Sequence, residues 1–185
     1  MDSIDVKKQK EAVEGWWNSE KSAKWDKKYD DYNAFSMKYL NSRQEKILQF
    51  VDELKLEKSS KVLELGFGAG QTALKLVQRG FEVHGVDVSK KFREIANSRC
   101  QKAYPGGKFF FKTGSLESKL DYESKKFDLV LVAGVFQYLY DHNRCVEEIY
   151  RVLKPGGYFI VAQKNAYCLS HLTSFRKLIR RLIYF

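Results

Sequence analysis

The sequence predicts an α/β fold of the Rossmann-like, doubly wound type, with a mainly parallel sheet and helices on both of its faces. Two observations lead to this class. From Lys61 onward, short apolar runs alternate with amphipathic helical segments over short links, the pattern of right-handed strand–helix–strand units. At the start of this region, the stretch KVLELGFGAGQT (61–72) places a glycine-rich turn between a strand and a helix, an arrangement that holds nucleotides. With 185 residues, the chain has room for one domain with a sizeable core.

The elements of the core follow in order from this alternation. The predicted strands are 61–65, 81–87, 108–114, 127–134 and 158–164. The fourth is the most apolar, as expected for a strand that is buried on both faces. The predicted helices are 70–79, 89–104 and 142–154. Gly80 suits the left-handed residue after the first helix, and Ser89 suits the N-cap of the second. Asp141 is expected to cap the third helix, which the Pro155–Gly157 turn ends.

Residues 1–60 are predicted to be helical and to form a cap or lid on the core. Within 33–57, apolar residues fall roughly on one helical stripe, although the polar residues 41–46 interrupt it. The stripe consists of Phe35, Tyr39, Ile47, Phe50, Val51 and Leu54. Upstream, 15–32 contains all three tryptophans of the chain together with Tyr29 and Tyr32. These aromatic residues either pin an N-terminal helix to the sheet or form a mobile lid over a ligand.

The last segment, 164–185, is predicted to be a basic amphipathic helix. Its apolar residues recur at helical spacing, and its five Lys and Arg residues have no acidic counterpart. They provide half of the formal net charge of +10. One interpretation is a peripheral membrane contact through 170–185. The other, which the apolar ending LIYF favours, is a helix that packs on the sheet and precedes two further strands outside this sequence.

Composition argues against several classes of protein. No apolar run approaches the ~20 residues needed to span a bilayer, and the charged N-terminus lacks the apolar core of a signal peptide. The three cysteines, Cys100, Cys145 and Cys168, are odd in number and far apart. A disulfide framework or a zinc site is therefore not expected, and no metal is predicted. Reduced, buried thiols instead indicate a cytoplasmic protein.

The glycine-rich turn favours a cationic nucleoside over a dinucleotide. Its glycines fall at 66, 68 and 70, whereas a dinucleotide fold needs the third glycine at 71, where Gln71 stands. Glu64 is expected at the carboxyl end of the first strand, where it would repel a pyrophosphate and attract an ammonium or sulfonium group. Asp87 ends the second predicted strand, where an acid accepts hydrogen bonds from ribose hydroxyls.

Four segments, VLELGFGAG, GVDVS, FDLVLVAGVFQYL and RVLKPGGYFIVAQ, occur in the order and spacing of the class I S-adenosylmethionine-dependent methyltransferases. The sequence resembles the broad small-molecule and lipid branch of this family, which includes quinone-biosynthesis enzymes. The resemblance covers about residues 60–163. It implies S-adenosyl-L-methionine as the cofactor and S-adenosyl-L-homocysteine as its product.

The resemblance also implies roles for individual residues. Glu64 and the three glycines would line the methionine moiety, and Phe92 would cover the adenine. Ser115 stands where the family commonly has an acid on the adenine amino group, so that Glu117 is a candidate substitute. The implied cofactor-binding residues are Glu64, Gly66, Gly68, Gly70, Asp87, Val88, Phe92, Ser115, Leu116 and Ala133.

Methyl transfer by in-line displacement needs alignment and desolvation more than it needs a strong acid or base. Few catalytic residues are therefore expected. If the acceptor is a hydroxyl group, a base would help, and Tyr138 and His142 are the candidate catalytic residues, with Asp141 and Tyr32 as further candidates. The alternative for His142 is that it only begins a helix that Asp141 caps.

The sequence thus predicts a helical cap or lid (1–60), a cofactor-binding Rossmann-like core (61–163) and a basic C-terminal helix (164–185). The predicted function is methyl transfer from S-adenosylmethionine to a small-molecule or lipid-linked acceptor. The alternatives are a cofactor-binding module that lacks a complete acceptor pocket, an RNA methyltransferase and an NAD-type oxidoreductase. A nucleic-acid partner is not expected, because half of the excess charge lies on the last segment and not across the fold. The oligomeric state stays open.

Overall fold

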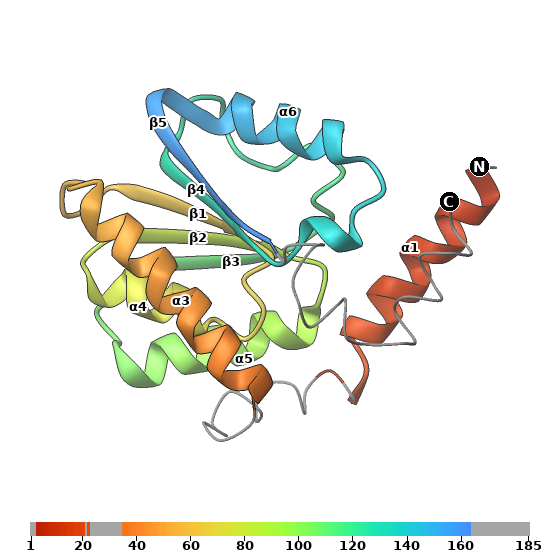
Figure 1. Cartoon of the computed structure of the whole chain (residues 1–185), viewed down its shortest axis with the longest axis horizontal. Coiled ribbons are helices and arrows are strands. Elements are labelled where there is room, and N and C mark those ends of the chain that lie inside the picture. Colours follow the sequence, from red (N-terminus) through yellow and green to blue (C-terminus); the bar gives the residue numbers. More distant parts are fainter. Residues whose placement is uncertain (1–2, 21, 23–34, 164–185) are drawn as a thin grey trace.

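The computed structural model describes residues 3–20, 22 and 35–163. Its centre is a five-stranded, all-parallel sheet with the strand order β3-β2-β1-β4-β5 (Figure 1). The strands are β1 (Lys61–Leu65), β2 (Glu82–Asp87), β3 (Phe109–Thr113), β4 (Phe127–Ala133) and β5 (Leu153–Ala162). The helices are α1 (Ser3–Trp17), α3 (Phe35–Glu53), α4 (Gln71–Gln78), α5 (Lys90–Ala103) and α6 (His142–Val152), and η1 (Phe136–Tyr138) is a single 3-10 turn.

Helices cover both faces of this sheet, which confirms the predicted fold class. Helices α3, α4 and α5 lie on one face and α6 lies on the other (Figure 1). The first face buries residues such as Val51 of α3, Leu76 of α4 and Cys100 of α5 against β1, β2 and β4. The second buries Ile149 and Val152 of α6 against the opposite sides of the same strands. Two apolar layers around one sheet produce the three-layer core that the sequence predicted.

Two sequence expectations need correction. Phe50 belongs to the predicted apolar stripe of its helix, but 46% of its surface is exposed, and the Lys46 ammonium lies 5.2 Å from its ring centre. The Pro155–Gly157 turn does not separate helix from strand, because β5 already begins at Leu153. Phe127 pairs with Leu153 and Leu129 pairs with Tyr158, so that the Pro-Gly-Gly segment bulges out within the strand.

The strand order locates the ligand site. The chain builds outward from β1 through β2 to β3, and then crosses back to place β4 on the other side of β1. In open α/β sheets, ligands bind outside the carboxyl ends of the strands at this reversal. The carboxyl ends of β1, β2 and β4 carry Glu64, Asp87 and Ala133.

Several predictions concern residues outside the described part. The basic helix at 164–185, its membrane contact at 170–185, and Trp25, Tyr29, Tyr32 and Cys168 all lie there. Within the described ranges, Cys100 and Cys145 are buried free thiols, and no helix is long and apolar enough to cross a membrane.

Candidate cofactor site

The turn after β1 has a backbone that glycine alone adopts with ease. Gly66, Gly68 and Gly70 have φ angles of 72°, 54° and 78°, in the left-handed region where a side chain costs energy. The amide of Gly70 donates to the carbonyl of Phe67, at 3.0 Å, and closes the turn. Helix α4 begins directly afterwards, at Gln71.

Gly70 does not line the pocket that Gly66 and Gly68 line. Its place in the fold is a close approach to α5, because a Cβ at this position would lie 2.7 Å from the Cβ of Ala96 and 3.0 Å from its Cα. The third glycine therefore allows the turn after β1 to pack closely against α5.

We expect Gly70→Ala to lower the free energy of unfolding by about 2–4 kcal/mol, because it combines left-handed strain with a clash against backbone. Urea titration followed by circular dichroism measures this change. Gly68→Ala is the matched control: its φ angle is also positive, but a Cβ there meets nothing within 4 Å. Equal losses in the two variants would contradict the packing role of Gly70.

Glu64 is a buried carboxyl group without a full set of partners. The residue is 3% exposed, and among the described residues Oε2 has no hydrogen-bond partner. Burial is the main cause that raises the pKa of Glu64, to about 8, and the nearby Asp87 carboxylate raises it further. The charge of Arg43 and a hydrogen bond from the Ala73 backbone amide act in the opposite direction. A cationic group placed beside Oε2 would supply the missing partner.

Asp87 organises the loops around the expected ribose. Its Oδ2 accepts from the Gly68 amide and its Oδ1 from the Ser89 amide, both at 2.9 Å. Burial raises the pKa of this carboxyl group, and the hydrogen bonds from the backbone of Ser89, Gly68 and Val88 counteract the rise. Each carboxylate oxygen can accept a second hydrogen bond, so that ribose hydroxyls can bind without displacing either amide.

The nucleoside part of the site is apolar. Phe92 lies in the first turn of α5, where its amide donates to the Ser89 N-cap. It is 3% exposed and lines the pocket with Val88 and Leu116. Ser115 also lines it. Glu117, the candidate substitute acid, lines the pocket as well, and its Oε1 accepts from the backbone amides of the loop before α6 and lies 3.2 Å from Lys10 Nζ.

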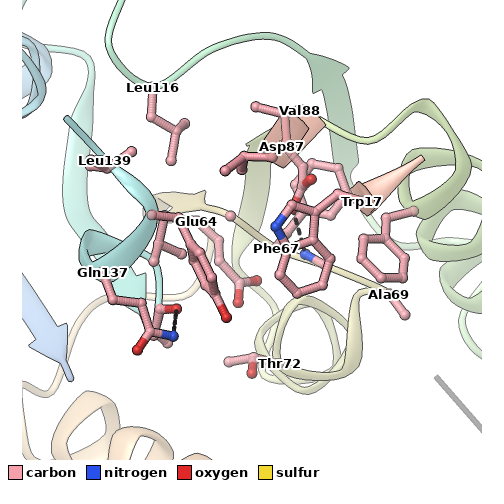
Figure 2. A pocket seen from close by; sticks show the side chains of 18 of the residues that line it. Trp17, Glu64, Phe67, Ala69, Thr72, Asp87, Val88, Leu116, Gln137 and Leu139 are labelled. Carbon is pink, nitrogen blue, oxygen red and sulfur yellow. Dashed lines mark hydrogen bonds between the residues drawn. The ribbon is translucent and has the colours of Figure 1, made fainter. Parts of the chain in front are cut away.

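These residues share one pocket of about 280 Å³. Figure 2 shows the side chains of Glu64 and Asp87 directed toward the same hollow, with Trp17 on one side and Gln137 on the other. Of the ten predicted cofactor-binding residues, all except Gly70 line it, and so does Tyr138.

His142 does not line this pocket. Its ring stacks on Phe136, with ring centres 5.7 Å apart, and its Nε2 lies 2.9 Å from the Phe136 carbonyl oxygen. It begins α6, and Asp141 caps that helix by accepting from the Arg144 amide. The alternative explanation for His142 therefore agrees with the structure, and the geometry gives no support to its predicted role as a base.

Sequence reasoning missed Arg43 of α3. This residue lines the pocket, and its guanidinium group lies against Gly134 at the end of β4. Within the described ranges, no hydrogen bond or ion pair of this side chain is found, although its charge acts on Glu64. A signal was present: Arg43 and Gln44, which also lines the pocket, fall in the polar stretch that interrupts the apolar stripe of the helix.

Comparison with known proteins identifies the family. A family model described as a methyltransferase domain matches residues 63–161, more than half of the chain, and the protein belongs to this family. The predicted membership of the S-adenosylmethionine-dependent methyltransferases is thereby confirmed, and with it the class of cofactor.

Individual relatives agree with this assignment. A demethylmenaquinone methyltransferase of Leptospira interrogans is 30% identical over 136 residues, which cover 72% of this chain and 55% of that protein. A ubiquinone biosynthesis O-methyltransferase of Pelagibacter ubique is 27% identical, over 89% of this chain and 67% of the relative. A crystal structure of a SAM-dependent methyltransferase from Methanosarcina mazei superposes with a TM-score of 0.55 and 26% identity, over 60% of this chain and 55% of the other. The chain thus spans about half the length of the first of these relatives.

Proposed function

We propose that this protein transfers a methyl group from S-adenosylmethionine to a small-molecule acceptor, and that the acceptor is a lipid-linked quinol. The observation that carries the first part is the carboxyl oxygen of the buried Glu64 that has no hydrogen-bond partner among the described residues and faces the pocket at the carboxyl end of β1. The names of two relatives, a demethylmenaquinone and a ubiquinone-biosynthesis methyltransferase, support the choice of acceptor.

The residues of the site fit this cofactor. Glu64 and Arg43 would hold the ammonium and the carboxylate of its amino acid part, because both groups face one pocket and neither bonds the other among the described residues. Asp87 would accept from the ribose hydroxyls, while Phe92 and Leu116 would enclose the base. When bound, the cofactor supplies an electrophilic methyl group.

The residues of the chain itself would contribute by positioning the acceptor beside the cofactor and by excluding water from the pocket. Ala133 and Gly134 at the end of β4 line the pocket, and Val135 and Leu139 bound it with apolar surface. Alignment of two reactants in such an environment removes about 7–11 kcal/mol from a barrier in favourable cases. The hydroxyl of Tyr138, on this wall, could bond an acceptor oxygen. We propose a cytoplasmic location as well, which the buried free thiols of Cys100 and Cys145 support.

The test uses cofactor with an isotope-labelled methyl group and reduced quinones with short prenyl chains. We expect labelled methyl quinol to form. Tight binding of the cofactor without transfer to any quinol would contradict the acceptor class. Failure to bind either the cofactor or its demethylated product would contradict the whole proposal.

We expect Arg43→Gln to weaken binding of S-adenosylhomocysteine by about 10- to 100-fold, because a hydrogen bond between charged groups contributes about 1.5–3 kcal/mol. Calorimetry measures the change. Binding of 5′-methylthioadenosine, which has no amino acid part, should stay unchanged in the same variant. Arg93→Gln is a control on α5, away from the lining of the pocket. Equal weakening of both ligands would place Arg43 in a merely structural role.

A further inference from the structure

Helix α1 presents one face to the cofactor pocket. Lys10, Val13, Glu14 and Trp17 all line it, and residues at this spacing share one side of a helix. The helix lies beyond the carboxyl ends of the strands, apart from the helices that cover the sheet (Figure 1). It is therefore placed over the site and does not form part of the sheet layers.

The C-terminal end of α1 is fixed to the loop that follows β2. The Ser89 hydroxyl donates to the Trp17 carbonyl at 2.8 Å, and the Lys90 amide donates to Asn18 Oδ1 at 3.0 Å. This loop directly follows Asp87, the last residue of β2, which we assign to the ribose. A displacement of α1 at this end would therefore also displace the loop beside the nucleoside site.

The indole of Trp17 joins two walls of the pocket. Its ring centre lies 5.8 Å from that of Phe92 and 5.5 Å from that of Tyr138, which it meets edge to face. A planar base between two rings needs ~7 Å, twice the contact distance of carbon atoms, so that no base fits between Trp17 and Phe92. The indole instead lines the pocket beside Phe92 and Tyr138; Figure 2 shows Trp17 next to the labelled Asp87 and Val88.

The other part of α1 is held across the pocket by an ion pair. Lys10 Nζ lies 3.2 Å from Glu117 Oε1, and the Glu117 side chain is only 7% exposed. The same oxygen accepts from the amides of Tyr140 and Asp141. Glu117 is therefore a fixed anchor, and it keeps its two amide partners when Lys10 is removed.

We propose that Trp17 is a cofactor-binding residue that covers the nucleoside, and that the Lys10–Glu117 pair latches α1 over the pocket. Exchange of cofactor for product then requires α1 to lift. The inference rests on the function proposed above. The two features have different roles. Trp17 contacts the bound nucleoside, whereas the Lys10–Glu117 ion pair joins two parts of the protein and sets the barrier to entry and exit of the ligand.

The test measures association and dissociation of S-adenosylhomocysteine by stopped-flow fluorescence, and its Kd by calorimetry, on the full chain. For Lys10→Met we expect both rate constants to rise together by about fivefold, the equivalent of one partly exposed ion pair, with little change in Kd. For Trp17→Ala we expect mainly faster dissociation and a Kd weakened by about tenfold or more. Trp17→Phe should recover part of the affinity.

The control is Lys112→Met. Lys112 pairs with Asp121 and has 44% of its side chain exposed, against 41% for Lys10, but it does not line the pocket. Its rates should match those of the wild type. The inference is overturned if ligand binds and Lys10→Met changes neither rate constant, or if Trp17→Ala leaves Kd unchanged. Absence of any binding to the wild-type chain would instead remove the proposed function, and this inference with it.

Discussion

Replacement of Glu64 by glutamine should weaken binding of S-adenosylmethionine by about 10- to 100-fold while leaving 5′-methylthioadenosine binding intact. Glutamine keeps the shape of the side chain but cannot offer a charge to the ammonium group, a loss of about 1.5–3 kcal/mol. 5′-Methylthioadenosine has no ammonium group, so that it reports on the nucleoside site alone. Calorimetry with both ligands measures the two effects, and parallel losses would contradict a specific contact with the amino acid part.

The pH dependence of binding gives a second test of the same residue. With a pKa of about 8, Glu64 is mostly protonated in the free protein at neutral pH. An adjacent ammonium favours the carboxylate, so that binding releases a proton and affinity rises with pH until about pH 8, by up to tenfold per unit. Kd measured across this range, in buffers of different ionisation enthalpy, detects the released proton. The Glu64→Gln variant should lose this dependence.

The stability of the cofactor-free protein should fall as the pH rises toward 8, whereas the affinity for the cofactor increases over the same range. The pKa of Glu64 is raised from 4.5 to about 8 on folding, so that between these values the unfolded chain is ionised where the folded chain holds a proton. Stability from this group is therefore present at low pH and is lost as the pH rises to about 8. Above this value Glu64→Gln should melt at a higher temperature than the wild type. A lower melting temperature there would show that the ionised carboxylate is well solvated.

Replacement of Asp87 by asparagine should weaken binding of both S-adenosylhomocysteine and 5′-methylthioadenosine by at least about 100-fold. The carboxylate accepts from the amides of Gly68 and Ser89, and an amide side chain must turn its NH2 group toward one of them. The variant thus loses the acceptor for one ribose hydroxyl and for one backbone amide, and it also distorts the loop. Together these losses amount to about 3 kcal/mol or more, at least roughly 100-fold in affinity.

Asp128→Asn is a matched control for this variant. The Asp128 carboxylate also accepts a backbone amide, from Lys61 at 2.8 Å, and pairs with Lys154. It lies near the amino end of the sheet, because it belongs to the start of β4. We expect this variant to lose stability but to bind both ligands normally. Retained binding in Asp87→Asn would contradict the assignment of the ribose site.

Local signals in the sequence determined the fold and the nucleoside half of the site. Strands that are buried on both faces are continuous apolar runs, and a left-handed turn needs glycine. The carboxyl ends of parallel strands converge, so that Glu64 and Asp87 could be placed together from their positions alone. Phe92, Leu116 and Ala133 followed from the family resemblance, and the pocket contains them all.

Only the tertiary structure decided how segments distant in the sequence meet at the site. Arg43 and Trp17 lie on two helices before the core, and no periodicity tells which residue of a helix reaches a strand end far along the chain. Gly70 belonged to the same motif as Gly66 and Gly68, yet its hydrogen atom makes room for Ala96 of α5. His142 lay close to a predicted strand end, but its ring turned to Phe136. Periodicity and turn chemistry act within a few residues, whereas these contacts depend on packing between elements, which sequence spacing does not encode.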